Sequence, residues 1–359
     1  MKRPMILKVK GVSKSFGEQQ VLKPIAFEVA EGERICILGP SGCGKSTLLQ
    51  MVAGLLRIDE GEIEMDGRAV ERGRLYIPPE SRPINMVFQD YALWPHMTVR
   101  QNIEYGMKRR KMNGQHRERT LQRLQSLLKL DGLLDRLPAQ LSGGQQQRVG
   151  IARALATEPK LLLMDEPLSN LDVKLRTDMR GELARLLEDL AIASLYVTHD
   201  RMEAFTVAHR ILVLREGRID QIGKPQELFE RPASPWVAQL MGYHNRLNAR
   251  IDPGAKSHAR IADRPIQGQR MITSVQDGPA VIMVHPEGIR LHEKEDAEGN
   301  LLPVLVAQSI YEGTRWRVIV HTADHQAIHL FHHQGVEPGS EVWIELPPEQ
   351  TMVYAGEGL

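Results

Sequence analysis

The clearest chemical signal in the chain is a glycine-rich stretch with the spacing of a phosphate-binding loop. Its residues are Gly39, Pro40, Ser41, Gly42, Cys43, Gly44, Lys45, Ser46 and Thr47. Glycines at this spacing let successive backbone N–H groups turn inward around phosphate oxygens, and a helix that begins here adds its positive end. Lys45 would reach the β- and γ-phosphates, and the Ser46 hydroxyl would bind Mg²⁺. The stretch predicts a nucleoside triphosphate site, and the alternative is a glycine-rich turn that matches by chance.

Two carboxylates, Asp165 and Glu166, follow the apolar run 161–164. A carboxylate at the C-terminal end of a strand points into the crevice where α/β proteins bind ligands. Asp165 is placed to organise Mg²⁺, directly or through water, and Glu166 to polarise an attacking water molecule. Phosphoryl transfer depends mainly on positioning and charge neutralisation, which these groups can supply. Taken alone, the pair is equally typical of a helix cap.

A second pair of adjacent glycines lies in Leu141-Ser142-Gly143-Gly144-Gln145, ahead of a helix expected over 146–157. Adjacent glycines at the start of a helix are typical of an anion-binding turn. Because the chain already has one phosphate loop, this turn would serve a second triphosphate, bound mainly by another copy of the chain. The alternative is a Ser142 N-cap with a flexible lead-in.

These residues require strands and helices that hold them in place. Continuous apolar runs, which favour buried parallel strands, occur at 34–38, 161–164 and 194–198. Helical patterns alternate with them, from the phosphate loop to about Gly54 and over 115–130 and 173–190. This alternation predicts an α/β fold for the first part of the chain.

The pattern changes after Met241. Short β-type runs, separated by glycine, proline and aspartate turns, occur at 270–275, 280–284, 316–320, 327–331 and 341–346. Such runs are typical of a small all-β barrel or sandwich. Residues 1–240 contain 36 basic and 30 acidic side chains, whereas 241–359 contain 10 and 15. The chain of 359 residues is therefore expected to have two domains, 1–240 and 241–359.

Composition excludes several classes of protein. The net charge of +1 gives no reason to expect nucleic-acid binding over the whole molecule. Cys36 and Cys43 are too few for a disulfide framework. No apolar run approaches the ~18 residues that span a bilayer, and the N-terminus lacks the apolar core of a signal peptide. We therefore expect a protein of the reducing cytosol that does not itself cross a membrane.

The order of these motifs resembles the ATP-binding subunits of ABC transporters. Between the phosphate loop, known there as the Walker A loop, and His199 come Gln89, the signature at 141–145, the two carboxylates and Ser169-Asn170-Leu171-Asp172. The resemblance covers roughly residues 6–235, and the signature is highly specific to that family. It implies an α/β P-loop NTPase fold with a helical signature subdomain. It also implies ATP hydrolysis by a head-to-tail homodimer that encloses two ATP molecules with Mg²⁺.

The resemblance gives each matching residue a role. The γ-phosphate of the partner copy's ATP would be bound by Ser142, Gly143, Gly144 and Gln145. Gln89 would bind Mg²⁺ and water, and Asp172 would contact the opposite site across the dimer. His199 would hold the γ-phosphate and Glu166 in register, and Phe16 would stack on adenine. Structural roles are the alternatives for His199 and Phe16.

The stretch from Gln89 to Thr98 is unusually apolar, with Tyr91, Leu93, Trp94 and Met97. Exposed apolar patches mark interaction sites, and in this family the corresponding region binds the coupling helix of a membrane permease. The resemblance thus implies a protein at the cytoplasmic face of the inner membrane, which acts with transmembrane subunits and indirectly with an extracytoplasmic solute-binding protein. The alternative is burial of these side chains within the same chain.

The last third resembles the oligomer-binding (TOBE) domain of importer ATPases, at 284–290 and 339–346, with His285 in place of the usual arginine. The resemblance favours importers of ferric iron, polyamines, phosphonates, sulfate or sugars, with the iron and polyamine branches closest. Soluble ABC ATPases of DNA maintenance or translation are the alternative class. Only 52 residues separate Gln89 from Ser142, too few for the long coiled coil of the former, and one cassette is present where the latter usually have two.

A histidine-rich segment follows, with His321, His325, His329, His332 and His333. Clustered imidazoles could bind a transition metal. No cysteine accompanies them, and Asp324 is the one carboxylate between 321 and 333. The favoured interpretation is therefore a solvated face of a hairpin.

Overall fold

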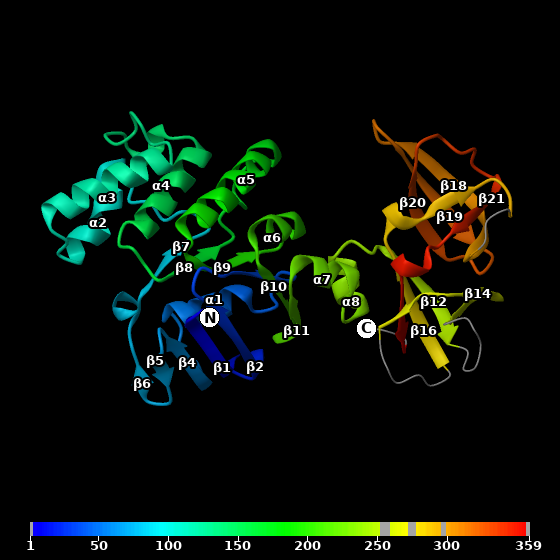
Figure 1. Cartoon of the computed structure of the whole chain (residues 1–359), viewed down its shortest axis with the longest axis horizontal. Helices are drawn as coiled ribbons and strands as arrows, with labels where there is room; N and C mark the ends of the chain where they lie inside the picture. The colour runs from blue at the N-terminus through cyan, green and yellow to red at the C-terminus, as the bar shows by residue number, and fades with distance from the viewer. Residues whose placement is uncertain (1–2, 252–258, 272–277, 296–298, 357–359) are drawn as a thin grey trace. The chain divides into compact units, whose positions relative to one another are not determined.

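The computed structural model describes residues 3–251, 259–271, 278–295 and 299–356. The chain forms two compact units, Met1–Pro225 and Gln226–Leu359 (Figure 1). The first unit is α/β and the second is built mainly of strands, which confirms the expected fold classes. This division falls ahead of the change of pattern at 240, because two short helices belong with the second unit. They are α7 (Pro225–Glu230), which begins at the last residue of the first unit, and α8 (Pro235–Leu240).

A six-stranded sheet with the order β11-β10-β3-β9-β8-β7 forms the centre of the first unit. Its strands are β3 (Arg34–Leu38), β7 (Ile84–Val87), β8 (Leu161–Asp165), β9 (Ala193–Thr198), β10 (Arg210–Arg215) and β11 (Arg218–Gly223). All neighbours pair in parallel except β11, which forms a hairpin with β10. The register aligns Leu38 with Thr198 and Asp165 with Val197. The carboxyl ends of β3, β8 and β9 therefore meet at one edge, as a crevice site requires.

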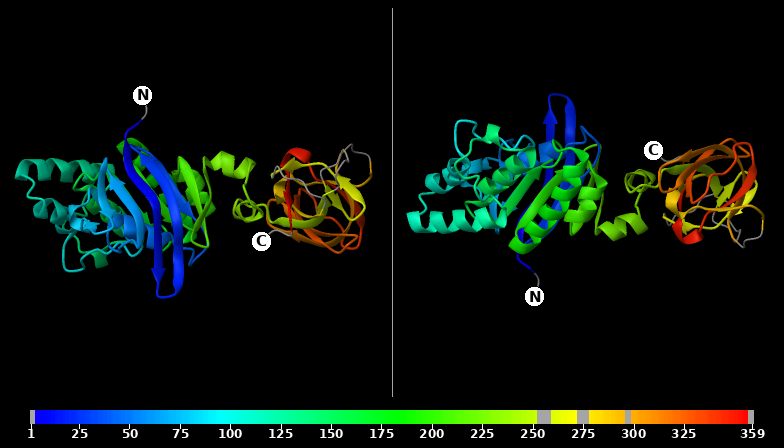
Figure 2. Two further views of the ribbon diagram at one scale, coloured as in Figure 1. Left: turned by 90° about the horizontal axis from the view of Figure 1, so that it is seen from below. Right: turned by 90° about the horizontal axis from the view of Figure 1, so that it is seen from above.

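A second, antiparallel sheet has the order β2-β1-β4-β5-β6, and Figure 2 shows β1 and β2 as one long blue hairpin. Its strands are β1 (Met5–Phe16), β2 (Gln19–Ala30), β4 (Glu60–Met65), β5 (Arg68–Arg72) and β6 (Leu75–Tyr76). The helix α1 (Lys45–Ala53) contributes Leu48, Leu49 and Val52 to a buried apolar cluster that includes residues of both sheets. Thus α1, which starts in the phosphate loop, is fixed by the main core of the unit.

The remaining helices of this unit are α2 (Val99–Arg109), α3 (Gly114–Leu127), α4 (Gly143–Leu155), α5 (Val173–Leu190) and α6 (Arg201–Val207). Figure 1 shows α2, α3 and α4 together at one end of the unit. The expected helix over 146–157 begins earlier, at Gly143, because Ser142 caps it. The helix expected over 115–130 ends at Leu127, because Lys129 adopts a left-handed conformation. The helix over 173–190 is confirmed.

The second unit contains two sheets, β14-β13-β12-β16-β22-β15 and β17-β21-β18-β19-β20. The first sheet is formed by β12 (Asn245–Ile251), β13 (Ala259–Ile261), β14 (Arg264–Ile266), β15 (Gln269–Arg270), β16 (Gly278–Val284) and β22 (Thr351–Ala355). The other is formed by β17 (Arg290–His292), β18 (Leu301–Tyr311), β19 (Trp316–Thr322), β20 (Ala327–His332) and β21 (Glu341–Glu345). Apolar side chains of both sheets share one buried core.

Four of the five expected runs in this unit match β16, β19, β20 and β21, and the run 341–346 extends one residue beyond β21. The fifth, 270–275, overlaps β15 only at Arg270, and residues 272–275 of that run lie outside the described residues.

Candidate functional site

The phosphate loop joins β3 to α1 and is shaped by its glycines. Gly42 and Gly44 have φ angles of +80° and +103°, which side chains rarely tolerate. A Cβ at Gly39 would lie 2.3 Å from the Leu214 carbonyl oxygen. Gly44 is the N-cap of α1 and has no side chain to occupy the first N–H groups of the helix. These groups can therefore bind an anion.

Lys45 lies inside this loop and is only 5% exposed. Its Nζ donates hydrogen bonds to the carbonyl oxygens of Gly39 at 2.9 Å and Pro40 at 2.8 Å. The ammonium group is thus held by the loop itself, at the start of the helix whose N–H groups face the site. A phosphate in the loop would meet a fixed positive charge as well as the backbone donors.

The neighbouring Ser46 connects the loop to β8, because its Oγ donates to Asp165 Oδ1 at 3.1 Å. Burial raises the pKa of Asp165, and the nearby charge of Glu166 acts in the same direction. Because burial disfavours the ionised form of this carboxyl group, a bound cation would stabilise it. The hydroxyl of Ser46, the carboxylate of Asp165 and the amide of Gln89 are oxygen donors of the type that Mg²⁺ prefers.

Gln89 follows β7 and is exposed, and its backbone carbonyl accepts a hydrogen bond from Asn170 Nδ2 at 2.9 Å. Because β7 pairs in parallel with β8 and aligns Val87 with Met164, the backbone brings Gln89 to the same sheet edge as Asp165. The structure therefore places the three predicted magnesium ligands at one edge of the central sheet.

Glu166 has a φ of +44°, a left-handed conformation that costs a residue with a side chain about 1–3 kcal/mol. Its N–H donates to the Val197 carbonyl at 3.0 Å, which fixes the turn after β8 to β9. In this turn Glu166 Oε2 lies 3.1 Å from His199 Nδ1. The predicted pairing of Glu166 with His199 is therefore present, and the two side chains remain accessible.

The signature residues form a capped helix start. Gln145 N–H donates to Ser142 Oγ, and the Gln145 side-chain oxygen accepts from the Ser142 N–H at 2.9 Å. Ser142 and Gly143 are exposed, whereas Gly144 is buried next to Leu175. Ser142 is thus the N-cap of α4, which was the structural alternative for this residue. Because Ser142 and Gly143 are exposed, the start of α4 is still accessible to another molecule.

Asp172 and Phe16 are also exposed. Asp172 Oδ1 accepts a hydrogen bond from Leu175 N–H at 3.0 Å and caps α5. Phe16, at the end of β1, is 50% exposed, with Lys14 Nζ 5.5 Å from its ring centre. An exposed ring with so little cover can accept a flat partner such as adenine.

The apolar stretch from Gln89 to Thr98 is not wholly exposed. Tyr91 is only 4% exposed and packs against Gly150 of α4, so for this residue burial within the chain replaces the expected exposure. Trp94 is half-buried, with its ring 4.5 Å from that of Tyr105 and 4.9 Å from the Arg153 guanidinium. These three side chains line a groove that Phe88 and Ala92 also border. The surface open to a partner is thus narrower than the sequence indicates.

A buried carboxylate beneath His199 was not found from the sequence. Glu203 of α6 is 3% exposed, and one of its oxygens accepts hydrogen bonds from Tyr196 Oη and Thr198 Oγ1, both at 2.8 Å. Burial raises the pKa of Glu203. These two hydrogen bonds join the end of β9, which precedes His199, to α6, which follows it. The available signal was an acidic residue four positions after the histidine, which is also common on exposed helices.

No cluster of three or more histidine, cysteine, aspartate or glutamate side chains that could hold a metal occurs in the described parts of the chain. Of the histidine segment, His332 and His333 have ring centres 6.3 Å apart. The described geometry therefore gives no support to the metal alternative for 321–333. None of the described helices is long and apolar enough to cross a bilayer.

Comparison with known proteins places this geometry in a family. Residues 22–169 match the ABC transporter family, and 282–353 match the TOBE domain. The chain is 42% identical to the sn-glycerol-3-phosphate import ATP-binding protein UgpC of Salmonella typhimurium, over 98% of each chain. The protein of the same name from Escherichia coli O157:H7 is 41% identical, again over 98% of each.

Two solved structures resemble the first unit. One is the dimeric, post-hydrolysis state of the ATP-binding cassette MJ0796 with ADP and phosphate, which is 33% identical, with a TM-score of 0.53, over 61% of this chain and 99% of that one. The other is CbiO1 of Clostridium perfringens, part of the transporter complex CbiONQ, which is 30% identical, with a TM-score of 0.57, over 63% and 91%.

These matches do not favour the alternative of a soluble ABC ATPase of translation or DNA maintenance. They also point away from the iron and polyamine branches, because the relatives named above are sn-glycerol-3-phosphate importers. The agreement over both units and the assembled phosphate site lead to one conclusion. The chain belongs to the ATP-binding proteins of ABC-type importers, which bind ATP and hydrolyse it to drive transport.

Proposed function

We propose that this chain energises uptake of a small polyol phosphate, with sn-glycerol 3-phosphate as the first candidate. It would act at the cytoplasmic face of the membrane, with a separate permease and, indirectly, a solute-binding protein. The support is identity of 41–42% to sn-glycerol-3-phosphate import proteins over 98% of their length. The solute is contacted by other chains, so this choice rests on relatives and not on residues of the site. Residues 241–359 would form the regulatory domain.

The proposed catalytic roles follow from the geometry of the first unit. Lys45 and the loop 39–47 would bind the β- and γ-phosphates, because the ammonium group and the free N–H groups of α1 converge there. Ser46, Gln89 and Asp165 would hold Mg²⁺, which neutralises charge that develops on the phosphates.

Glu166 would accept a proton from the attacking water. His199, 3.1 Å from Glu166, would orient its carboxylate and contact the γ-phosphate.

A second copy of the chain would complete each site. Ser142 and Gly143 remain exposed at the start of α4, where they can reach an ATP bound by the partner copy. A solved relative of this unit is dimeric. ATP would favour the closed dimer, because only that state gives the nucleotide both sets of contacts, and hydrolysis would allow it to open.

Isolation of the native complex tests this proposal. A tagged Glu166→Gln chain would be recovered from gently solubilised membranes, and its partners identified by mass spectrometry. We expect a permease and its binding protein, and uptake of labelled sn-glycerol 3-phosphate when the wild-type complex is reconstituted with ATP. Uptake of a metal, polyamine or sugar instead would contradict the solute. Recovery of only ribosomal or DNA-bound partners would contradict the transport function.

Trp94→Ala should separate ATP hydrolysis from transport. Trp94 borders the groove beside Tyr105 and Arg153 and lies outside the phosphate loop, so ATPase activity of the isolated chain should stay within about twofold. Loss of a central aromatic contact costs about 2 kcal/mol or more of docking free energy, roughly thirtyfold in affinity. The measurement is affinity for the permease and ATP-driven uptake in reconstituted vesicles.

Tyr311→Ala, which removes an aromatic side chain of the other unit that is 61% exposed, is the matched control. An equal loss of soluble ATPase activity and transport in Trp94→Ala would show that this surface is not a docking site.

A further inference from the structure

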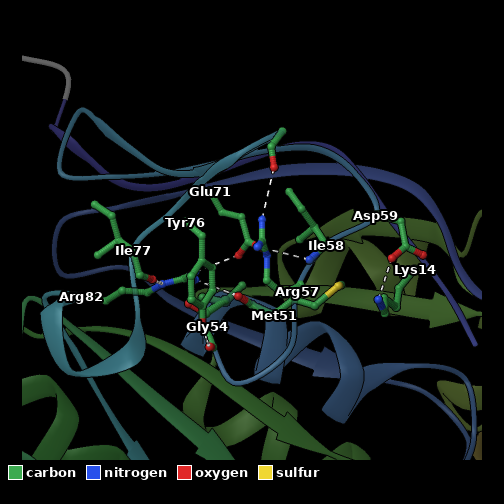
Figure 3. Close-up of polar contacts among 12 residues, drawn as sticks. Lys14, Met51, Gly54, Arg57, Ile58, Asp59, Glu71, Tyr76, Ile77 and Arg82 are labelled. Carbon is green, nitrogen blue, oxygen red and sulfur yellow. Dashed lines mark hydrogen bonds and ion pairs between the residues drawn. The ribbon is translucent and has the colours of Figure 1, made fainter.

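The guanidinium of Arg82 is buried in the first unit and bonded through all its nitrogens (Figure 3). Its Nη1 donates to the carbonyl oxygens of Met51 and Val52, both at 2.9 Å. Its Nε donates to the carbonyl of Ile77 at 2.8 Å, and Nη2 donates to Glu71 Oε2 at 2.8 Å. Arg82 is only 1% exposed, as is Glu71. This single side chain therefore joins the last turn of α1, strand β5 and the segment between β6 and β7.

The groups around this cation are arranged to accommodate it. Gly54, the C-cap of α1, has a φ of +79°, and a Cβ there would lie 2.6 Å from the Arg82 guanidinium carbon. The Tyr76 hydroxyl donates to the Gly54 carbonyl at 2.6 Å. The other oxygen of Glu71 accepts hydrogen bonds from Ile58 N–H at 3.1 Å and Arg57 Nε at 3.2 Å. The end of α1 and the chain that follows it are thus fixed to one buried ion pair.

Stability alone is a weak reason for such a pair. Removing two charges from water costs several kcal/mol per ion, and apolar replacements of similar volume are often as stable. The planar guanidinium instead fixes the relative positions of three segments, because its donors reach four acceptors on them at once.

Two elements next to Arg82, helix α1 and strand β7, lead to the proposed magnesium site. The helix α1 begins with Lys45 and Ser46, and Arg82 bonds its opposite end. Strand β7 begins two residues after Arg82, at Ile84, and ends at Val87, two residues before Gln89. Helix α1 and the paired strand β7 are rigid over their lengths. A shift of the last turn of α1 or of the start of β7 would therefore also move the opposite ends of these two elements. A shift at Arg82 would therefore change the separation of Ser46 from Gln89.

We propose that Arg82 is a positioning residue that holds Ser46 and Gln89 at the spacing which binds Mg²⁺ beside the nucleotide. The inference rests on the proposed function, in which these two side chains are ligands of Mg²⁺. Arg82 is buried and would act through α1 and β7, without contact to the nucleotide or the metal.

The test compares affinity for the ATP analogue AMP-PNP in EDTA and in excess Mg²⁺, by calorimetry on the full chain. The ratio of the two dissociation constants measures the contribution of the metal and does not depend on the folded fraction of the sample. In Arg82→Lys, an ammonium can still pair with Glu71 but cannot span all four acceptors. We expect the affinity of this variant in EDTA to stay within about threefold of wild type. Its magnesium ratio, which is the dissociation constant in EDTA divided by that in excess Mg²⁺, should be about tenfold lower, as for residues that support metal ligands.

Arg57→Gln is the matched control, because it removes the other guanidinium bonded to Glu71 while leaving α1 and β7 untouched. Its magnesium ratio should equal that of wild type. Arg82→Met should lower the ratio further than Arg82→Lys, and its thermal unfolding would be recorded alongside.

Two results would overturn the proposal. Arg82→Lys with an unchanged magnesium ratio, whatever its unfolding temperature, would show that Arg82 only stabilises the fold. A wild-type chain whose affinity for AMP-PNP does not respond to Mg²⁺ would overturn the proposed magnesium site as well. The wild-type measurement thus distinguishes the two failures.

Discussion

Glu166→Gln should reduce the rate of ATP hydrolysis by about 10²–10⁴-fold, the usual contribution of a general base. Gln has the size of Glu but cannot accept a proton from water. Its side chain can still hydrogen-bond His199, which lies 3.1 Å from the Glu166 carboxylate. ATP affinity should therefore stay within about threefold of wild type. The measurement is steady-state ATPase activity together with the affinity for ATP in Mg²⁺.

The same variant should accumulate in the ATP-bound, closed state, which size-exclusion chromatography with ATP would show as a dimer. Glu118→Gln, on the exposed face of α3, is a suitable control because it changes a similar side chain outside the site. Undiminished turnover in Glu166→Gln would remove this residue from the catalytic step. Loss of ATP binding would show instead that the side chain supports the fold of the site.

Local sequence was sufficient where short-range rules apply. The apolar runs at 34–38, 161–164 and 194–198 lie in β3, β8 and β9, because strands covered on both faces need apolar residues at successive positions. The phosphate loop could be recognised because its glycines meet a local backbone requirement. The parallel register then brings residues that are distant in the sequence to one sheet edge.

Features that depend on tertiary contacts could not be predicted in this way. Arg82, Glu71 and Glu203 have the sequence appearance of ordinary solvated charges, and only the folded chain buries them. The partners of Arg82 at Met51 and Val52 lie about thirty residues earlier, and no local pattern relates them. The apolar neighbours of Tyr91 predict that it belongs to a docking surface, yet α4 covers it.

The short strands of the second unit posed a different problem. β13 and β14 have three residues each, too few for an alternating pattern to distinguish a strand from a loop. They are defined by pairing with each other and by the shared core of the two sheets. Under the proposed function the solute would be selected by other chains, so no pattern in this sequence could identify it.

Lys45→Met should strongly weaken nucleotide binding with little effect on the fold. Met preserves the unbranched shape of the side chain but removes the ammonium group that lies inside the loop. A charge-assisted hydrogen bond contributes about 1.5–3 kcal/mol, so the loss of contacts to two phosphates should weaken ATP binding by about 10²-fold or more. The measurement is calorimetric affinity for AMP-PNP, with and without Mg²⁺.

The unfolding temperature of the nucleotide-free chain separates this effect from misfolding. Lys45→Met loses two hydrogen bonds to Gly39 and Pro40 and also removes a buried charge, and these changes oppose each other. We therefore expect only a small shift without nucleotide, whereas the rise in unfolding temperature that ATP produces in wild type should disappear. Lys160→Met, which removes an exposed ion pair with Asp66, should keep that rise. If Lys45→Met bound AMP-PNP within about threefold of wild type, the loop backbone alone would account for phosphate binding, and the ammonium group would have only a structural role.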